Sequence, residues 1–463
     1  HPLGVPPKWK RLVRYGIGKF HAWLPTLADP PEEFSLSCFP LAEPGILDLE
    51  VGENIKVAKL LNVKQNQTPR RIGRFGSLLI AGMAVFGAVR ILRLHQLGGN
   101  DWITGDWLIN YEGGFIRRGL SGSIILVASD GSNGNPIFVT GIFLAILWFA
   151  TCIAVLSIWK KSAPNFGRLA VLMSPGFLAF DIWDFQGGAR KELIFFAFLA
   201  IMLATHQRSH QHRFWRRVWI STFALVPAFL ILMHEMLALF IPLLMVVFYL
   251  LSQKYDAPAS ERFIFYSTLS LTSFASLMAV VLHPGTVVQG KIICESLTER
   301  GTTEFICGGA ISWLGRTPAE EIVSLQEYAS SPFRLTMYAI TVGMSLIPFL
   351  YFRSRRHGAR MSPYLLMSLA TAALIPLFAI GLDWGRWIHL ASASWSIIIL
   401  GIPSLFKPRP FARILQASRD TTVKTTAIFL FALSWSIDHF NGNDIYPGVI
   451  RLAEAFNIGR FFP

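Results

Sequence analysis

Apolar residues occur in long runs that short charged segments separate. A run of about 20 such residues can cross the hydrocarbon core of a bilayer as an α-helix. By this criterion the chain contains about eleven spans, of which the third and fourth are short enough to be tilted, broken or re-entrant. They cover residues 76–96, 136–158, 168–180, 192–205, 218–233, 236–251, 263–283, 335–352, 363–382, 388–406 and 422–437.

The backbone in such runs must satisfy its own hydrogen bonds, because hydrocarbon offers no partners. Helices do so, whereas a transmembrane barrel would show short segments of alternating polarity. Composition agrees, since 52% of the 463 residues are hydrophobic and only 15% are charged. Soluble proteins contain about 25% charged residues, so a water-soluble enzyme is excluded. The sequence therefore predicts an all-α polytopic integral membrane protein.

Lys and Arg gather in alternate connections between the runs, which predicts that those connections are cytoplasmic. The N-terminus is therefore expected in the cytoplasm, and an odd number of spans puts residues 441–463 outside. The net charge of +14 indicates topology and contact with anionic membrane lipids, not nucleic-acid binding. The basic clusters lie in the N-terminal tail, at Lys160 and Lys161, and within residues 208–217, 254–262, 353–360 and 407–424.

Residues 1–70 precede the first run and lack the apolar core of a signal peptide. Between Trp9 and Leu24 apolar residues recur at helical spacing, basic residues fill the other face, and Pro25 ends the pattern. This predicts a cytoplasmic tail with an amphipathic helix on the membrane surface. A disordered basic tail is the alternative. The transmembrane domain is expected to cover residues 71–440.

The outer loop at 284–334 is the one long connection of that domain. It carries Cys294 and Cys307 on the side expected to be oxidising, which predicts a disulfide between them. Cys38 and Cys152 fall in the tail and in a span, so we expect free thiols there. The stretch that begins at Thr317 and Pro318 has the pattern of a short helix that could cover a cleft.

The unusual polar motifs all fall in connections predicted to be outside, whereas the inner connections are plain basic linkers. The first motif is GDWLINYEGGFIRRGLSG at 105–122, and the second is DIWDFQGGARKE at 181–192. The pair His234 and Glu235 and the segment DWGRW at 383–387 complete the set. Loop charges are usually solvated and Gly-Gly usually marks a turn, so each motif by itself also has a structural explanation.

These motifs contain several Lys and Arg residues, which is unusual because outer segments of membrane proteins normally contain few of them. The guanidinium of Arg presents a planar fork that matches phosphate oxygens. If the motifs converge, they predict a site for a phosphate or pyrophosphate group. The candidate phosphate ligands are Arg117, Arg118, Arg190, Lys191 and Arg386.

His234 and Glu235 stand between two apolar runs with no soluble loop to separate them. Charged residues in such a setting are costly unless they face a polar cavity, and this makes the pair a functional-site candidate. A hydrogen bond between helices is the structural alternative. Either residue could serve as a general base, and so could Asp106 or Asp383.

Two further sets of residues are weaker candidates. Four tryptophans could stack on sugar rings, although residues of the interfacial belt are an equally simple explanation. A divalent ion could be held by Asp101, Asp106 or Glu112 together with Asp181 or Asp184, but the spacing has many accidental matches. No metal or other cofactor is therefore expected to be required. The four tryptophans are Trp107, Trp183, Trp384 and Trp387.

The order NYEGGFIRRGLSG, GGARKE, an intramembrane HE and DWGR resembles bacterial polytopic proteins of polysaccharide assembly. That group is similar in architecture to O-antigen or exopolysaccharide polymerases and to the GT-C class of glycosyltransferases. The resemblance covers about residues 75–440 and rests on short motifs. It implies a protein of the bacterial inner (cytoplasmic) membrane with its active face in the periplasm or outside the cell.

The resemblance further implies glycosyl transfer from a polyprenyl-(pyro)phosphate-linked glycan to a sugar acceptor, as in repeat-unit polymerisation. Other polysaccharide-assembly proteins would then be partners. A GT-C enzyme that uses a polyprenyl-phosphate sugar is an alternative, although no compact DxD or ExD motif occurs in the first outer loop. A transporter or flippase for lipid-linked glycans is another, without a visible internal repeat. A membrane acyltransferase using His234 and a purely structural subunit remain open.

Overall fold

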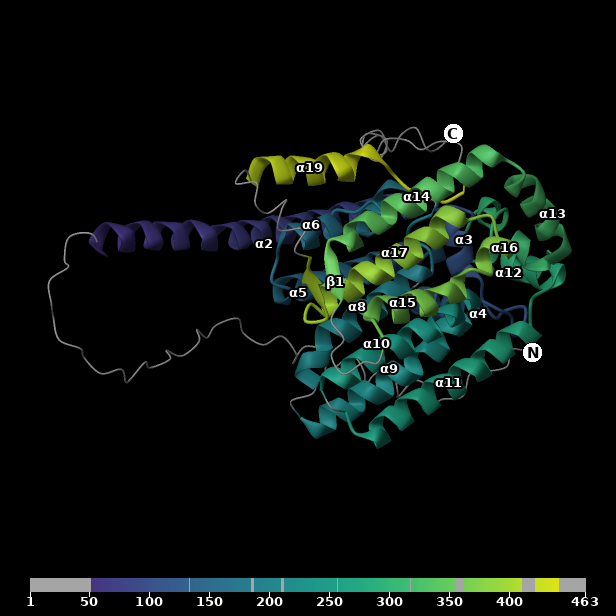
Figure 1. The fold of residues 1–463 in the computed structure, drawn as a ribbon. Helices are drawn as coiled ribbons and strands as arrows, with labels where there is room; N and C mark the ends of the chain where they lie inside the picture. Colours follow the sequence, from purple (N-terminus) through teal and green to yellow (C-terminus); the bar gives the residue numbers. More distant parts are fainter. Residues whose placement is uncertain are drawn as a thin grey trace. The chain divides into compact units, whose positions relative to one another are not determined.

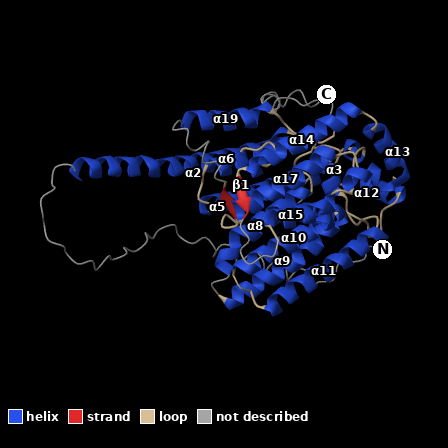
Figure 2. Cartoon of the chain, in the orientation of Figure 1, coloured by secondary structure: helices blue, strands red, loops and turns tan. Residues whose placement is uncertain are grey.

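The computed structural model describes residues 51–440 except 133, 185–186, 210–211, 256, 317, 355–360 and 410–420. The chain divides into two units, His1–Leu61 and Asn62–Pro463, and nearly all of the described residues belong to the second. The regular secondary structure of the described residues is helical apart from two short antiparallel strands, β1 (Phe352–Ser354) and β2 (Phe406–Pro408) (Figures 1 and 2). The amphipathic helix predicted at residues 9–24 and the C-terminal tail lie outside the described residues.

Long helices make up most of this unit. They are α2 (Val51–Gln96), α5 (Pro136–Lys161), α8 (Glu192–Ser209), α9 (Arg213–Met233), α10 (Ile241–Lys254), α11 (Ala259–Leu282), α14 (Pro332–Leu350), α17 (Trp384–Gly401) and α19 (Thr421–Ser434). The other α-helices are α3 (Ile103–Leu108), α4 (Gly119–Ser132), α6 (Phe166–Leu172), α7 (Leu178–Trp183), α12 (Val287–Glu299), α13 (Pro318–Ala329), α15 (Pro363–Thr371) and α16 (Leu377–Ile380). Single turns of 3₁₀ helix complete the set: η2 (Glu235–Phe240), η3 (Glu304–Cys307), η4 (Ser312–Gly315) and η5 (Ala372–Leu374).

Within the described residues, seven helices are long and apolar enough to cross a membrane. The all-α polytopic class is confirmed, but the predicted number of about eleven spans was too high. The seven candidates are Pro69–Gln96, Pro136–Lys161, Arg213–Met233, Glu235–Lys254, Ala259–Leu282, Pro332–Leu350 and Pro363–Ile380.

The four remaining predicted runs are helical but differ from a regular span. Residues 168–180 are divided between α6 and α7, with a non-helical break between the two. The runs at 192–205 and 422–437 form shorter apolar helices. Helix α17 carries Arg386, His389 and three serines, and most of its residues are buried. The difference therefore lies in length and polarity: one run is divided, two form short helices, and α17 carries polar residues in its first half.

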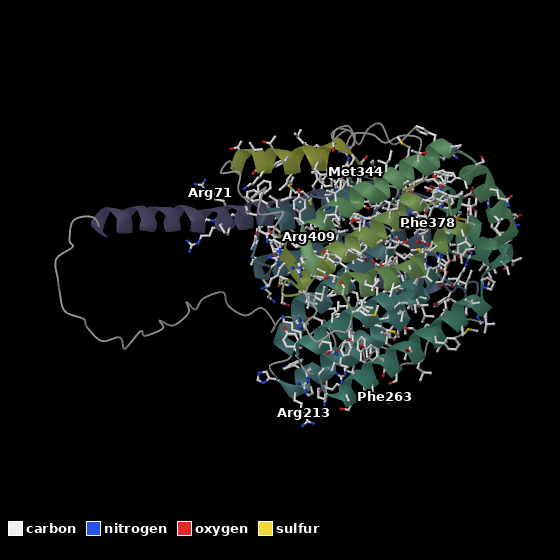
Figure 3. The ribbon with its side chains drawn as sticks, viewed as in Figure 1. Arg71, Arg213, Phe263, Met344, Phe378 and Arg409 are labelled. Atoms are coloured by element: carbon white, nitrogen blue, oxygen red, sulfur yellow. A yellow bond between two sulfur atoms is a disulfide. The ribbon has the colours of Figure 1, made fainter. Side chains whose placement is uncertain are left out.

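The helices run back and forth, so that the connections gather at two ends. At one end Arg117 N donates to His283 O, and Gly385 N donates to His439 O. At the other end Lys161 Nζ donates to Ala204 O, and β1 pairs with β2. Arg71, Arg213 and Arg409 lie toward this second end (Figure 3). We call the two ends the polar-motif end and the basic end.

Tryptophans of α5 fix the distance between α5 and α2. Trp159 Nε1 donates to Gly73 O at 3.0 Å, and Trp148 Nε1 donates to Met83 O at 3.1 Å. A Cβ atom at Gly76 would lie 2.3 Å from the ring of Trp159. Small residues permit such close approach of membrane helices. This contact holds α2 where it delivers the first polar motif to the polar-motif end.

Candidate functional site

The predicted motifs come together at the polar-motif end. Ion pairs link residues of the first motif to the second motif and to the His234–Glu235 pair, and α17 joins through its first turn. We call this set the charged network. Its members are Asp106, Arg117, Arg118, Lys191, Glu192, His234, Glu235, Asp383 and Arg386.

Arg117, Arg118 and Glu235 form a partly exposed rim of the charged network. Arg118 Nε donates to both carboxylate oxygens of Glu235, at 2.8 and 3.0 Å, and Arg118 Nη2 donates to one of them as well. Arg117 Nη1 lies 3.6 Å from the same carboxylate. About a quarter of each of these three side chains is accessible to solvent (27, 27 and 23% for Arg117, Arg118 and Glu235). This rim of the network is therefore partly accessible to solvent.

The backbone of Arg118 is set in an unusual conformation. Its φ of 66° is in the left-handed region, which residues other than glycine rarely adopt. The buried Nζ of Lys191 donates to Arg118 O at 3.0 Å and supports this turn. The turn orients the Arg118 guanidinium toward η2, where Glu235 is the first residue.

Asp106 forms the buried floor of the charged network. Its carboxylate lies 3.6 Å from Lys191 Nζ and 3.7 Å from Arg118 Nη1. Burial alone would raise the pKa of Asp106, but the charges of Lys191 and Arg118 outweigh burial and lower the pKa to about 2. Burial lowers the pKa of Lys191 to about 8, against the opposing effect of Asp106. Asp106 is thus an ionised structural anchor in this arrangement.

Arg386 joins the second half of the charged network. It donates to Glu192 Oε1 at 2.8 Å and to the carboxylate of Asp383. His234 Nε2 lies 3.9 Å from the same oxygen of Glu192, which connects the two halves. Arg386 and Glu192 are buried, whereas about a quarter of the Asp383 side chain is exposed. Arg190 lies within electrostatic range of Arg386 and Asp383.

The tryptophans predicted to stack on sugars serve mainly as packing residues in this structure. Trp107 is completely buried and donates its Nε1–H to Ala189 O at 3.0 Å. Trp384 is buried against Tyr328 and Tyr338, and Trp387 is buried beneath Arg386. Only Trp183 is partly exposed among the four. Three of the four rings are therefore buried in this structure.

The carboxylates considered for a metal ion separate into different surroundings. Glu112 pairs with Arg300 at 3.3 Å, and Asp101 accepts a backbone hydrogen bond from Ala310 through its carbonyl. Asp181 lies 3.7 Å from His389 Nε2. Burial and the neighbouring Glu192 raise the pKa of Asp181 to about 8. Asp184 alone among them joins a group of potential metal ligands, with Asp438 and His439.

Sequence reasoning missed Asp438 and His439. His439 Nδ1 lies 2.8 Å from Asp184, a residue 255 positions away in the sequence. One signal was available, because Asp438 and His439 directly follow the last apolar run in the same way as His234 and Glu235 follow another. The hydropathy criterion ends that last run at residue 437, so the pair falls in the connection to the tail, where charges are usually solvated.

The long outer loop packs on the first motif. Cys294 of α12 and Cys307 of η3 form the predicted disulfide. Gln289 Nε2 donates to Gly113 O at 3.2 Å, and Ala310 N donates to Asp101 O at 3.1 Å. The predicted helix after Thr317 is present as α13. The loop therefore braces the segment that carries Arg117 and Arg118.

Replacing both cysteines of this loop with serine should loosen it. A loop of this length gains about 3 kcal/mol from a disulfide, mainly by restricting the unfolded chain. We expect faster backbone hydrogen exchange in α12 and η3 of the double variant, with α9 and α11 unchanged. Equal exchange rates in the loop of both proteins would contradict this role.

The comparisons with known proteins place the chain in a family. Residues 70–307, just over half of the chain, match the model of the family described as uncharacterised membrane protein Rv1490. The matched part includes Asp106, Arg118, Lys191 and Glu235 and both disulfide cysteines, whereas Arg386 and His439 lie beyond it. Neither the curated proteins nor the solved structures contain a match. The match supports a membrane protein but not the resemblance to polysaccharide polymerases or GT-C enzymes. The chain is a membrane protein that belongs to the Rv1490 family.

Proposed function

We propose that the charged network binds the phosphate groups of a polyprenyl-linked glycan and that the protein transfers this glycan to a sugar acceptor at the outer face of the membrane. Repeat-unit polymerisation is the form of the reaction that we favour. The observation that carries the proposal is the convergence of cations from three separate segments, around residues 117–118, 190–191 and 386, on one partly exposed network.

The rim of the charged network supports recognition of a phosphate. Nε and Nη2 of Arg118 each donate to an oxygen of the Glu235 carboxylate, and phosphate oxygens fit the same two-armed geometry. Arg117 is close enough to contribute a second charge. A phosphate that enters the rim would compete with Glu235 for Arg118. Lys191 and Asp106 would stay in place below as a fixed support.

The same competition supplies a base. When phosphate occupies Arg118, the Glu235 carboxylate loses its bidentate partner and becomes available to accept the proton of an acceptor hydroxyl. The hydroxyl oxygen then forms a bond to the anomeric carbon while the bond from that carbon to the phosphate oxygen breaks. The electron pair of the broken bond stays on the phosphate, where the Arg side chains stabilise it. Asp383 is the other partly exposed carboxylate and the alternative base.

A transporter for the same lipid is the second candidate. The break between α6 and α7, which run from the basic end to the polar-motif end, favours it. Interrupted helices in membrane transporters are typical of substrate and ion sites. The chemistry of recognition would be the same, because a carried lipid phosphate also needs cations.

Reconstitution distinguishes the two candidates. The purified full-length chain in liposomes would be given a polyprenyl-pyrophosphate oligosaccharide, and glycan length and transbilayer movement would be measured separately. Longer glycans are expected under our proposal, whereas movement without elongation would favour the transporter. If neither occurs with a protein that still binds the lipid, glycosyl transfer is rejected for this substrate class.

The buried Lys191 predicts a pH dependence of ligand binding. Its pKa of about 8 means that it is charged below pH 8 and loses the charge above it. Affinity for a lipid-linked pyrophosphate diester, whose own charge is constant here, should fall roughly tenfold between pH 7 and pH 9.5. Binding measured by microscale thermophoresis would check this. In Lys191→Met the affinity should already be low at pH 7 and flat with pH, and a wild-type slope in that variant would refute the assignment.

A further inference from the structure

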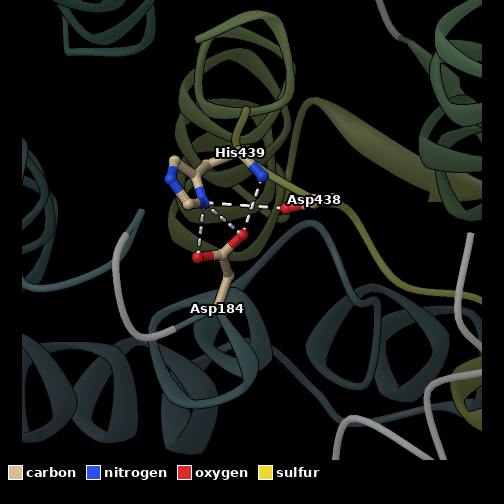
Figure 4. A group of neighbouring side chains, drawn as sticks. All are labelled: Asp184, Asp438 and His439. Atoms are coloured by element: carbon tan, nitrogen blue, oxygen red, sulfur yellow. Dashed lines mark hydrogen bonds and ion pairs between the residues drawn. The ribbon is translucent and has the colours of Figure 1, made fainter. Parts of the chain in front are cut away.

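Asp184, Asp438 and His439 form a compact group beside the charged network. Asp184 Oδ2 accepts hydrogen bonds from the backbone N of His439 at 2.7 Å and lies 2.8 Å from His439 Nδ1. The Nδ1 atom lies 3.7 Å from Asp438 Oδ1. One ligand atom from each residue lies within 4.8 Å of the others (Figure 4). The three side chains therefore point toward one common position.

The donor types suit a divalent cation. Two carboxylates and one imidazole are a mixed oxygen and nitrogen set, which Zn²⁺ and Mn²⁺ accept and which Ca²⁺ and Mg²⁺ use less often. Ligand atoms at about 2.0–2.2 Å from one ion lie roughly 3–4 Å apart from each other. The separations in the group are close to this range. Small side-chain rotations are enough to gather the three donors around an ion.

The surrounding backbone holds the ligands in place. Gly187 N donates to Asp184 Oδ1 at 2.8 Å, and the backbone N of His439 holds the other oxygen. Hydrogen bonds of this kind orient carboxylates in metal sites. A Cβ atom at Gly385 would lie 1.7 Å from Asp438 O, and one at Gly187 would lie 2.5 Å from His439 Cβ. Only glycine permits this approach, so the segment 438–439 is tightly seated against α17.

From this geometry we propose that Asp184, Asp438 and His439 bind one divalent transition-metal ion, Zn²⁺ or Mn²⁺. On binding, the ion takes the place between Asp184 and Nδ1, and the imidazole proton moves from Nδ1 to Nε2 so that the Nδ1 lone pair can coordinate. Asp184 is buried, while His439 and Asp438 keep some exposure (13% each). The exposed side leaves room for water or a ligand oxygen to complete the coordination.

The position of the ion would be next to the proposed phosphate site. Gly385 N donates to His439 O at 3.2 Å, one residue from Arg386. Arg190 and Asp383 are both within electrostatic range of His439. Metal binding does not depend on the glycosyl-transfer proposal, since the ligand set stands by itself. The two can therefore fail separately.

Titration of the full-length protein tests the site. After treatment with a chelator, the purified protein would be titrated with Zn²⁺ and with Mn²⁺ by calorimetry, and the bound metal would be counted by elemental analysis. One ion per chain is expected. Asp184→Asn and His439→Ala should weaken binding at least about 100-fold, and His283→Ala, which removes an exposed imidazole near the same end, should leave it unchanged.

Asp438→Asn tests the metal site even if the other two variants do not fold. It keeps the hydrogen bonds between Asp184 and His439, so we expect a folded protein with affinity at least about tenfold lower. No binding of either metal to the wild type would overturn the proposal. Binding that persists unchanged in Asp184→Asn and Asp438→Asn would overturn it too, and would show that the group is a hydrogen-bonded clamp between two segments.

Discussion

Glycan elongation in liposomes is expected to fall at least about 100-fold when Arg118 is replaced with Ala. The variant loses the fork that would hold a phosphate oxygen pair, and charge-assisted hydrogen bonds of this kind are worth roughly 1.5–3 kcal/mol each. Arg118→Lys should also be defective, because Lys keeps the charge but not the planar fork. Elongation by reconstituted protein, with lipid binding measured in parallel, would quantify both effects.

A matched control is available at the basic end. Arg216 also forms an ion pair with a carboxylate, to Glu261 at 2.7 Å, and has similar exposure (24%). Arg216→Ala should retain elongation within about twofold, because among the described residues Arg216 pairs with Glu261 at the basic end and has no ion pair with the charged network. Normal glycan length from Arg118→Ala would remove the basis for the proposed phosphate site. Equal losses in the two variants would indicate a general effect on folding.

Arg386→Ala is expected to have the largest effect on stability. The substitution leaves the buried Glu192 without its guanidinium partner at 2.8 Å. Removing one partner of a buried pair costs about 3–5 kcal/mol, because the remaining charge is poorly solvated. The midpoint of thermal unfolding in detergent should therefore drop by roughly 5 °C for a chain of this size. Fluorescence-detected size-exclusion chromatography after heating would measure it.

The double variant Arg386→Met with Glu192→Leu separates charge burial from packing. Because apolar residues of similar volume often replace a buried pair without loss, we expect it to recover most of the lost stability. Activity should not return, since the cation next to Asp383 is absent. A double variant that is no more stable than Arg386→Ala would mean that the pair acts through its shape and hydrogen bonds, and not through its charge.

Much of the fold was predictable because hydropathy and turn chemistry are local properties. The apolar run at 136–158 became α5, which begins at Pro136 after the cap residue Asn135. The run at 168–180 was expected to be unusual, and it is divided between α6 and α7. The number of spans was overestimated because the runs at 192–205 and 422–437 form short helices and α17, most of which is buried, carries Arg386 and His389. Whether a helix is exposed to lipid depends on how the neighbouring helices pack against it, and an apolar run in the sequence does not show this.

The sequence identified many residues of the candidate site, but it did not show which of them contact one another. Arg117, Arg118, Lys191 and Arg386 were identified because cations are rare in outer segments. Their partners are set by the packing of the helices. Arg118 contacts Glu235, which is 117 residues away in the sequence, and Arg386 contacts Glu192, which is 194 residues away. The Asp184–His439 contact was missed for the same reason. A short motif shows which residue types are present. Which of them form ion pairs depends on where the helix ends lie in space.

The amino-acid sequence by itself determined that this is a helical membrane protein with polar motifs confined to alternate connections. That information is local, because the free energy of placing an apolar run or a cluster of Lys and Arg in lipid or water depends little on the neighbouring helices. Only the tertiary structure decided which charges compensate one another, which tryptophans are buried, and that Asp438 and His439 join Asp184. Those outcomes depend on distances between helix ends, and Coulombic and hydrogen-bond energies change steeply over a few ångströms.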